Sequence, residues 1–352
     1  MSVAPFSIAG RAIGADHPPY IVAELSGNHG GRLETALAMV DAAKAAGADA
    51  VKLQTYTADT LTIDHDGPGF LLQGGLWKGR TLYDLYGEAH TPWEWHAPLF
   101  DRARELGLAI FSAPFDASAV DLLEGLDCPA FKIASFELND LPLIRRAARS
   151  GKPMILSTGL ATLGEIAQAV EAAREGGAPV MLLHCVSGYP TPAEDCNLRT
   201  IPHLAQAFGV AVGLSDHTAG GAVPAAAVAL GAVLIEKHFV LSRADGGVDA
   251  AFSLEPDEFK AMADSARTAW AALGRVNYAL EPSEAGGRDY RRSLYIVTDV
   301  KAGDALTTEN VRSIRPGFGL APEHYDRVLG RRAARDLKRG EPLAWSMLAA
   351  EE

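Results

Sequence analysis

Eight short apolar runs along the first three-quarters of the chain constrain the fold more than any other feature. They cover residues 20–24, 50–54, 108–112, 130–135, 153–157, 180–184, 210–217 and 233–238. Ala-rich stretches of helical length separate them, with helices expected at residues 35–46, 162–175, 224–230 and 256–273. Continuous apolar runs that alternate with helices are typical of buried parallel strands. Eight strand–helix units predict an α/β fold of the (β/α)8 TIM barrel type.

The rest of the chain is organised around this barrel. Residues 1–280 contain the eight units, preceded by two strand-like pieces that we expect to form a hairpin at the barrel bottom. The polar, glycine-rich residues 281–292 predict a linker, and residues 293–352 a small second domain. Residues 57–93 form a long insertion between the second and third strands. Its many aromatic residues argue against disorder, and its position after a strand places it at the catalytic face.

Composition excludes several classes of protein. The formal net charge of −12 argues against a nucleic-acid or anionic-membrane partner. No apolar stretch approaches the roughly 20 residues of a membrane helix, and the first residues do not resemble a signal peptide. The three cysteines, Cys128, Cys185 and Cys196, form no CxxC motif. We therefore expect a cytoplasmic protein without disulfides.

Nearly every apolar run ends in a residue that can do chemistry, at the strand ends where a TIM barrel has its active site. His217 and His238 follow the seventh and eighth strands, with Asp216, Glu236 and Asp249 nearby. Two neighbouring imidazoles predict a divalent-metal site. The alternative is that each histidine only forms hydrogen bonds within the barrel top.

Lysines inside apolar strands point to an anionic ligand, because an unpaired buried ammonium is costly. Lys52 and Lys132 occupy such positions, and Lys237 is expected to join them. Hydroxyl and backbone donors suited to a phosphate or carboxylate follow the strands at Ser135, Ser157, Thr158, Gly159 and Ser215. One alternative to an anion-binding role is that the lysines form internal salt bridges, such as Lys132 with Glu137. Another is that a lysine is the nucleophile of a Schiff-base aldolase.

Two further residues are candidates for contact with a substrate. Glu24 ends the first strand and is suited to act as a general base or to accept a sugar hydroxyl, unless it caps local amides. Tyr189 lies in the rigid loop HCVSGYPTP after the sixth strand, where it either meets a substrate or packs.

Taken together, these segments resemble the sialic acid synthase family. The similarity rests on IVAELSGNHGG, AGADAVKLQTYT, FSAPFD, FKIASFE, ILSTGL, LLHCVSGYPTP, GLSDHT, IEKHF and, in the tail, RSIRPGFGL. The resemblance implies a TIM barrel followed by an antifreeze-like (SAF) domain. It also implies the condensation of phosphoenolpyruvate with an acetamido sugar, with release of phosphate by C–O cleavage. The segments LWKGRTLYDLYGEAHTPWEW, FSLEPDEF and RRSLYIVTDV are most similar to the branch that makes pseudaminic acid from 2,4-diacetamido-2,4,6-trideoxy-L-altrose.

The resemblance also implies roles for individual residues. Phosphoenolpyruvate would be held by Lys52, Lys132, Ser135, Ser157, Ser187 and Ser215. Ser187 stands where N-acetylneuraminate synthases commonly have Asn. The sugar would meet Glu24, Gln54, Tyr189, Asp249 and Arg315. His217 and His238 would bind a divalent metal, Mn²⁺ first and Mg²⁺ or Co²⁺ as alternatives. The tail residue Arg315 would act in a domain-swapped homodimer. N-acetylneuraminate and legionaminate synthesis, sugar binding without turnover and metal-dependent hydrolysis stay open as alternatives.

Overall fold

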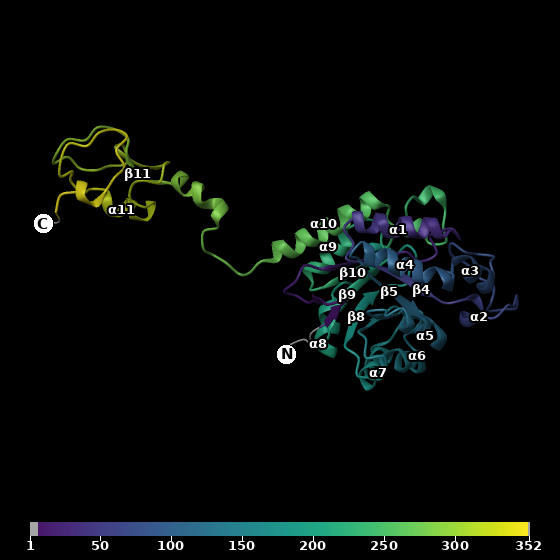
Figure 1. The fold of residues 1–352 in the computed structure, drawn as a ribbon. Coiled ribbons are helices and arrows are strands. Elements are labelled where there is room, and N and C mark those ends of the chain that lie inside the picture. Colours follow the sequence, from purple (N-terminus) through teal and green to yellow (C-terminus); the bar gives the residue numbers. More distant parts are fainter. Residues whose placement is uncertain (1–5, 351–352) are drawn as a thin grey trace. The chain divides into compact units, whose positions relative to one another are not determined.

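The computed structural model describes residues 6–350, and it contains the predicted barrel. Eight parallel strands close on themselves because β10 pairs with both β9 and β3 (Figure 1). The strands are β3 (Tyr20–Glu24), β4 (Ala50–Thr55), β5 (Ala109–Pro114), β6 (Phe131–Ile133), β7 (Met154–Ser157), β8 (Val180–Cys185), β9 (Ala211–Asp216) and β10 (Leu234–His238). The fold prediction is confirmed, and each strand overlaps its predicted apolar run.

One main helix follows each strand and packs an apolar face against the sheet (Figure 1). These helices are α1 (Leu33–Ala45), α4 (Trp93–Glu105), α5 (Ala117–Gly125), α6 (Leu141–Ala148), α7 (Leu163–Glu175), α8 (Thr200–Phe208), α9 (Ala222–Ala229) and α10 (Pro256–Leu273). Local signals fix their ends. Thr162 caps α7, where its hydroxyl accepts from Glu165 N while the Glu165 carboxylate accepts from Thr162 N.

The N-terminal hairpin, β1 (Phe6–Ile8) with β2 (Arg11–Ile13), lies at the bottom of the barrel as expected. Arg11 stacks on Tyr20, the first residue of β3, and forms an ion pair with Asp49, which precedes β4. Both contacts lie at the N-terminal ends of the strands. The opposite, C-terminal mouth is therefore left open for a site.

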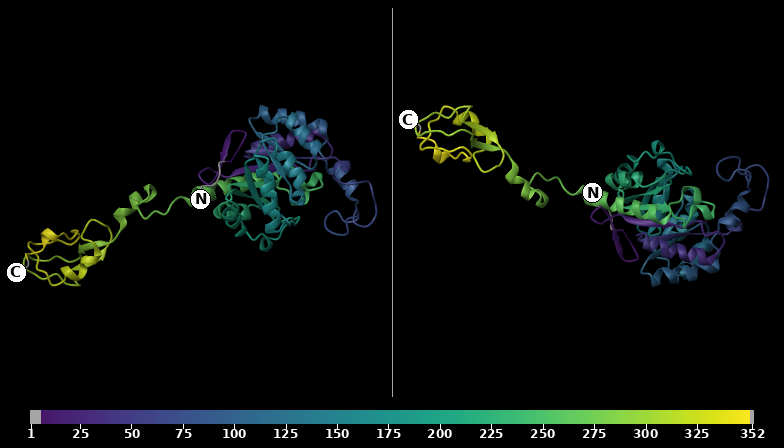
Figure 2. Two further views of the ribbon diagram at one scale, coloured as in Figure 1. Left: turned by 90° about the horizontal axis from the view of Figure 1, so that it is seen from below. Right: turned by 90° about the horizontal axis from the view of Figure 1, so that it is seen from above.

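The insertion between β4 and α4 is ordered and more regular than the predicted loop. It contains α2 (Ala58–Leu61) and α3 (Leu82–Ala89), and the loop between them projects from the edge of the barrel (Figure 2). Thr57 and Thr81 cap the two helices through their hydroxyls. The Trp77 indole donates to the carbonyl of Val248 in the loop after β10, at 3.0 Å, which anchors the insertion at the C-terminal mouth.

The chain divides into two compact units after Gly274. The second unit has its own apolar core, which includes Leu294, Ile296 and Val311. Its elements are η5 (Pro282–Tyr290), β11 (Ser293–Ile296), β12 (Val311–Ile314), η6 (Pro322–His324), α11 (Tyr325–Val328) and η7 (Trp345–Met347). The segment expected as a linker, residues 281–292, thus contains the 3-10 helix η5. Within residues 6–350 no helix is both long and apolar enough to cross a membrane.

Candidate active site

The two-residue alternation of a strand decides which side chains reach the barrel interior. On β10, Glu236 and His238 face inward, whereas Lys237 between them lies on the outer face. Lys237 is paired there with Asp216 of β9, its direct neighbour in the sheet, at 2.6 Å. The expectation that Lys237 joins the anion-binding lysines is therefore wrong. Asp216, which was expected beside the metal site, also faces away from the barrel interior, because it is paired with Lys237.

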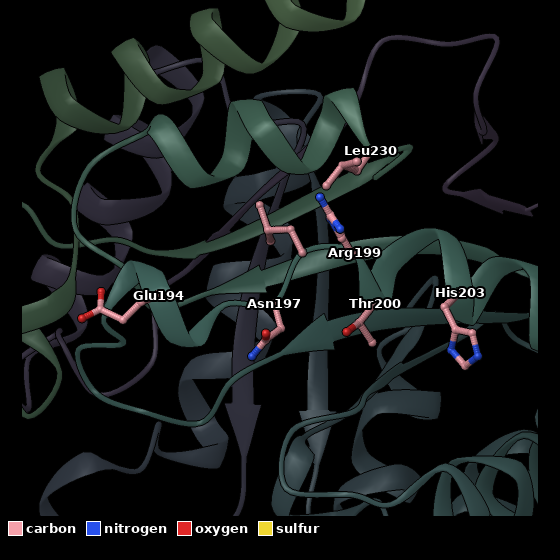
Figure 3. Close-up of a pocket in the computed structure, with 7 residues that line it drawn as sticks. Glu194, Asn197, Arg199, Thr200, His203 and Leu230 are labelled. Carbon is pink, nitrogen blue, oxygen red and sulfur yellow. The ribbon is translucent and has the colours of Figure 1, made fainter.

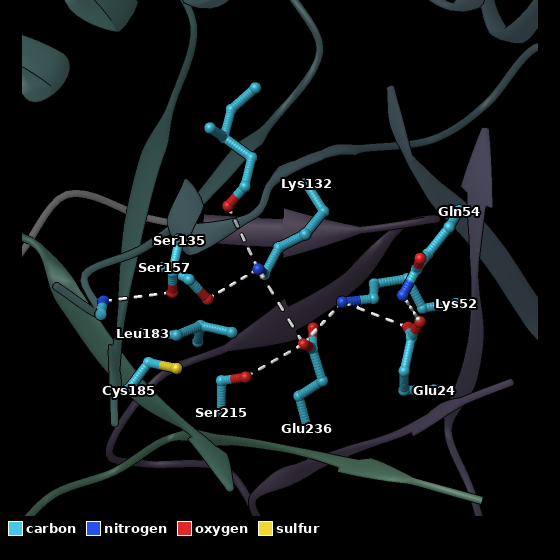
Figure 4. A network of polar contacts seen from close by, with 12 residues as sticks. Glu24, Lys52, Gln54, Lys132, Ser135, Ser157, Leu183, Cys185, Ser215 and Glu236 are labelled. Atoms are coloured by element: carbon cyan, nitrogen blue, oxygen red, sulfur yellow. Dashed lines mark hydrogen bonds and ion pairs between the residues drawn. The ribbon is translucent and has the colours of Figure 1, made fainter. Parts of the chain in front are cut away.

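Inside the barrel, Glu236 is the centre of a polar network that links the five strands β4, β6, β7, β9 and β10 (Figure 4). Its Oε1 lies 2.6 Å from Lys52 Nζ and 3.9 Å from Lys132 Nζ, and it accepts from Ser215 Oγ at 3.2 Å. Lys132 also donates to Ser157 Oγ at 2.6 Å. The internal ion pairs expected as the structural alternative do exist, but the partner of Lys132 is Glu236 and not Glu137. Glu236 was named from the sequence only as a neighbour of the metal site.

Lys52, Lys132, Glu236 and the adjacent Glu24 are the charged groups in and beside this network. Burial and the neighbouring Lys52 lower the pKa of Lys132 to about 8, against the pull of Glu236. Burial also opposes the charge on Lys52, but Glu236 and Glu24 outweigh it and raise the pKa of Lys52. The two lysines in turn outweigh the burial of Glu236 and lower its pKa to about 2. Burial, with the adjacent Glu236, raises the pKa of Glu24. Two buried ammonium groups, from Lys52 and Lys132, therefore converge on one firmly ionised carboxylate beside Glu24, and such a pair of ammonium groups suits an anionic ligand.

The serines predicted to hold an anion line the same region. Ser157 and Ser215 belong to the network around Glu236, as described above. Ser135 accepts from Gly159 N at 3.1 Å. A Cβ added to Gly159 would collide with the hydroxyls of both Ser135 and Ser187. The absence of a side chain at residue 159 thus leaves room for these two hydroxyls, one from the segment after β6 and one from the loop after β8, to converge.

The two predicted metal ligands lie side by side at the mouth. The ring centroids of His217 and His238 are 5.4 Å apart. His217 Nδ1 is 3.0 Å from the Val186 carbonyl, and His238 Nδ1 is 3.2 Å from Ser26 Oγ. Because both rings use Nδ1 in hydrogen bonds, Nε2 is the nitrogen that each ring would offer to a metal. Burial and the positive charge of His217 hold the pKa of His238 well below its usual value, so this imidazole is neutral.

These two nitrogens fit a divalent ion that also takes oxygen ligands from substrate and water. Within residues 6–350 no group of three or more His, Cys, Asp or Glu side chains forms a complete metal site. Asp249 is the nearest further carboxylate, with Oδ2 3.9 Å from His238 Nδ1. Burial is the main cause that raises its pKa.

The residues predicted to meet the sugar divide between the two units. Glu24 accepts from Gln54 Nε2 at 2.8 Å and lies 3.1 Å from Lys52 Nζ, beside the network. Tyr189 packs on His217 with ring centroids 4.5 Å apart, and Asp249 faces His238. The barrel thus brings these four together. Arg315 lies in the second unit.

Three residues of this region carry functional features that sequence reasoning missed. Cys185 faces inward from β8; burial opposes its ionisation, but His217, Ser135 and Lys132 lower its pKa to about 7. Burial raises the pKa of Glu137, which has an unpaired buried Oε2, to about 7. Phe252 packs on His238, with centroids 4.9 Å apart. Alternation along β8 would have identified Cys185, whereas Phe252 reaches the mouth only through a loop.

A separate cavity lies on the outer side of the barrel, between η2 (Ala193–Asp195), α8 and α9 (Figure 3). Its lining includes Glu194, Asn197, Arg199 and His203. None of the network side chains contributes to it. The polar network and the histidine pair at the mouth are therefore the candidate active site.

Comparison with known proteins identifies the family. The profile of the NeuB family matches residues 39–278, and that of the SAF domain matches residues 291–349. A pseudaminic acid synthase from Campylobacter jejuni is 47% identical over 93% of this chain and 96% of its own. A pseudaminic acid synthase from Helicobacter pylori is 46% identical over 93% of this chain and 97% of its own.

Solved structures agree with this assignment. The spore coat polysaccharide biosynthesis protein spsE from Bacillus subtilis superimposes with a TM-score of 0.68 and 35% identity, over 99% of this chain and 100% of its own. The resemblance inferred from the motifs is thereby confirmed: the chain belongs to the NeuB family and carries a SAF domain in its tail.

Proposed function

We propose that this enzyme condenses phosphoenolpyruvate with 2,4-diacetamido-2,4,6-trideoxy-L-altrose to give pseudaminic acid and phosphate. The observation that carries the proposal is the pair of buried lysines around Glu236, beside the histidine pair, in a chain 47% identical to a named pseudaminic acid synthase. The network suits an anion and the histidine pair suits a metal that polarises a carbonyl. Sites for both substrates therefore meet at one barrel mouth.

Phosphoenolpyruvate is held by Lys52, Lys132 and the four serines Ser135, Ser157, Ser187 and Ser215. The ammonium groups are already close to their partners, so they need little reorganisation when the anion binds. Ser187 and Ser135 offer hydroxyl donors on either side of Gly159. Charge-assisted hydrogen bonds of this kind hold phosphate and carboxylate oxygens well in a site that excludes water.

A divalent metal, which we propose to be Mn²⁺, would be held by Nε2 of His217 and His238. When bound, it supplies Lewis-acid polarisation of the open-chain aldehyde. The protein fixes the two rings through the Nδ1 contacts with Val186 and Ser26. Tyr189 and Asp249 then border the space that the sugar enters.

The reaction forms one C–C bond and breaks one C–O bond. The π electrons of phosphoenolpyruvate attack the aldehyde carbon through C3, and the aldehyde oxygen takes up a proton to become a hydroxyl. Water adds to the electron-poor C2 and gives its proton to Glu24. The new C2 hydroxyl then passes its remaining proton to the phosphate and becomes the C2 carbonyl, while the bond from C2 to the bridging oxygen breaks and this oxygen leaves with the phosphate. Burial raises the pKa of Glu24, which brings this base closer to the working pH.

Phosphate release tests the function. With phosphoenolpyruvate and Mn²⁺, we expect release with the trideoxy sugar and none with N-acetylmannosamine. Release with N-acetylmannosamine would instead indicate N-acetylneuraminate synthesis. Release only with the legionaminate precursor would indicate legionaminate synthesis. If none of the three sugars leads to phosphate release but one of them binds, the result would support a carbohydrate-binding protein. Turnover without phosphoenolpyruvate would support a hydrolase. A lysine adduct that can be trapped with borohydride would support a Schiff-base aldolase.

Isotopic labelling tests the bond that breaks. Phosphoenolpyruvate labelled with oxygen-18 at the bridging position should transfer the label to the released phosphate. If the label stays with the sugar product, the P–O bond is the one that breaks.

We also propose that two chains exchange tails, so that Arg315 of one completes the barrel site of the other. The chain carries exposed apolar side chains that suit burial in an assembly, with Val276 89%, Tyr278 97% and Phe318 64% exposed. An Arg315→Ala chain and a Lys132→Ala chain should each be inactive alone. Co-expressed hybrids should regain activity if Arg315 acts in trans, and should stay inactive if it acts in cis.

Three unpaired thiols suit a cytoplasmic location for the enzyme.

A further inference from the structure

Three aromatic side chains form a row that leads away from the metal-binding histidines. Phe252 contacts His238 and Tyr189, with centroid distances of 4.9 and 5.1 Å. The ring centroid of Tyr189 lies 4.5 Å from that of His217 and 6.2 Å from that of Trp77. We call Phe252, Tyr189 and Trp77 the aromatic wall. It begins at the imidazoles and ends in the insertion.

The aromatic wall is assembled from three separate loops of the barrel mouth. Phe252 belongs to η4 (Ala250–Phe252) after β10, Tyr189 follows β8, and Trp77 lies in the insertion after β4. Trp77 is held by the hydrogen bond from its indole to the Val248 carbonyl, in the same loop as Phe252. That bond uses the only polar group of the ring. What Trp77 offers a ligand is therefore its apolar face.

The order of the three residues sets which part of a sugar each would meet. This step rests on the proposed function, because the aldehyde carbon must lie at the imidazoles to be polarised. The sugar chain then extends from Phe252 past Tyr189 towards Trp77. Its first two carbons would lie near Phe252, and its far end, with the C4 acetamido group and C6, would lie near Trp77.

We propose that Trp77 is a specificity-determining residue that selects a methyl group over a hydroxymethyl group at C6. A methyl group gains from burial against the indole face. A C6 hydroxyl in the same place would lose water without finding a partner, because the indole N–H is already bound to Val248. A hydrophobic contact of this kind discriminates against an added hydroxyl by about 100-fold.

The test compares two sugars in four proteins. The sugars are the trideoxy substrate and its analogue with a hydroxyl at C6, measured as kcat/KM at saturating phosphoenolpyruvate. The proteins are the wild type and the variants Trp77→Ala, Trp77→Phe and Trp270→Ala. Trp270 is a matched control, because its indole also donates to a backbone carbonyl at 3.0 Å, that of Ala15. Ala15 follows the N-terminal hairpin, at the opposite end of the barrel from the mouth.

We expect the wild type to prefer the 6-deoxy sugar by about 100-fold. Trp77→Ala should reduce this preference at least tenfold and leave the KM for phosphoenolpyruvate within twofold. Trp77→Phe should keep most of the preference, although it cannot bond to Val248, because it retains an aromatic face. Trp270→Ala should keep the preference unchanged.

Other outcomes overturn the inference. If Trp77→Ala lowers kcat/KM equally for both sugars, or changes neither, the residue only anchors the insertion. If Trp77→Phe loses the preference as fully as Trp77→Ala, the hydrogen bond and not the apolar face carries the effect.

A variant at the other end of the wall tests the proposed order. Phe252→Leu should lower kcat/KM for both sugars by the same factor, because this residue lies at the aldehyde end. A selective loss for the 6-deoxy sugar would place C6 there and contradict the role of Trp77. A wild-type protein that releases no phosphate with either sugar would refute the proposed function itself, and this inference with it.

Discussion

Lys237 and Asp216 form an ion pair that is almost completely buried between the barrel and its helices. The Nζ–Oδ2 distance is 2.6 Å, and the two side chains are 0% and 2% exposed. Lys237→Met would leave the Asp216 carboxylate buried with only the Thr218 amide and hydroxyl as donors, both at 3.1 Å. Removal of one partner from a buried pair costs about 3–5 kcal/mol of unfolding free energy. The melting temperature of the barrel should fall by about 10 °C.

A second lysine–aspartate pair provides the control. Lys260 and Asp264 on α10 are 2.5 Å apart, but their side chains are 57% and 56% exposed. Lys260→Met should cost less than about 1 kcal/mol, because water screens an exposed pair. The comparison keeps residue types and distance almost constant, and the two pairs differ strongly in burial. Calorimetry and urea denaturation followed by circular dichroism would measure both variants.

A double variant tests the physical reason. Adding Asp216→Asn to Lys237→Met removes the unpaired charge while an amide oxygen can still accept from Thr218. We expect the double variant to be more stable than Lys237→Met alone. The reasoning is refuted if Lys237→Met costs no more than Lys260→Met, or if the second substitution only adds further loss.

Three further predictions concern the reaction. The kcat/KM for phosphoenolpyruvate should fall as pH rises above about 8, because burial lowers the pKa of Lys132 to about 8 and the neutral amine no longer attracts an anion; a pH–rate profile of the free enzyme measures this. Gly159→Ala should raise the KM for phosphoenolpyruvate about 10- to 100-fold, because the new methyl group displaces Ser135 and Ser187. An unchanged KM would show that these two hydroxyls do not bind phosphoenolpyruvate. Excess chelator should abolish phosphate release, and added Mn²⁺ should raise the melting temperature of the wild type but not of His217→Ala; full activity of that variant in chelator would contradict a metal role.

Local patterns in the sequence were sufficient for most of the barrel. The run at residues 20–24 is β3, and the helix expected at residues 256–273 is α10, with the same bounds. The run at residues 130–135 becomes only the three residues of β6, because the chain turns into the 3-10 helix η1 (Ser135–Glu137). The caps of α2 and α3 lay in the sequence at Thr57 and Thr81. These two caps were missed because each threonine follows a segment in which apolar residues do not recur at a regular spacing.

The identity of the candidate site residues was predictable in part. His217 follows β9 and His238 ends β10, whereas Lys52 and Lys132 lie within β4 and β6. Barrel geometry alone gathers these four residues. Lys237 was assigned wrongly, although alternation along β10 excludes it once His238 is placed inside the mouth. Sequence spacing within one strand was therefore enough to correct this error, and no tertiary information was needed.

Apolar periodicity, caps and strand ends are local properties of the chain, so the amino-acid sequence was enough to predict the eight strand–helix units, the tail domain and the chemical types at the mouth. Tertiary structure alone decided that Glu236 joins Lys52 and Lys132, because closure of the barrel places β10 beside β3. It also decided that Trp77 and Phe252 both lie next to Tyr189, although 174 positions separate residues 77 and 252. Contacts between loops of different strands depend on the closed sheet that carries them, and no local pattern encodes that closure.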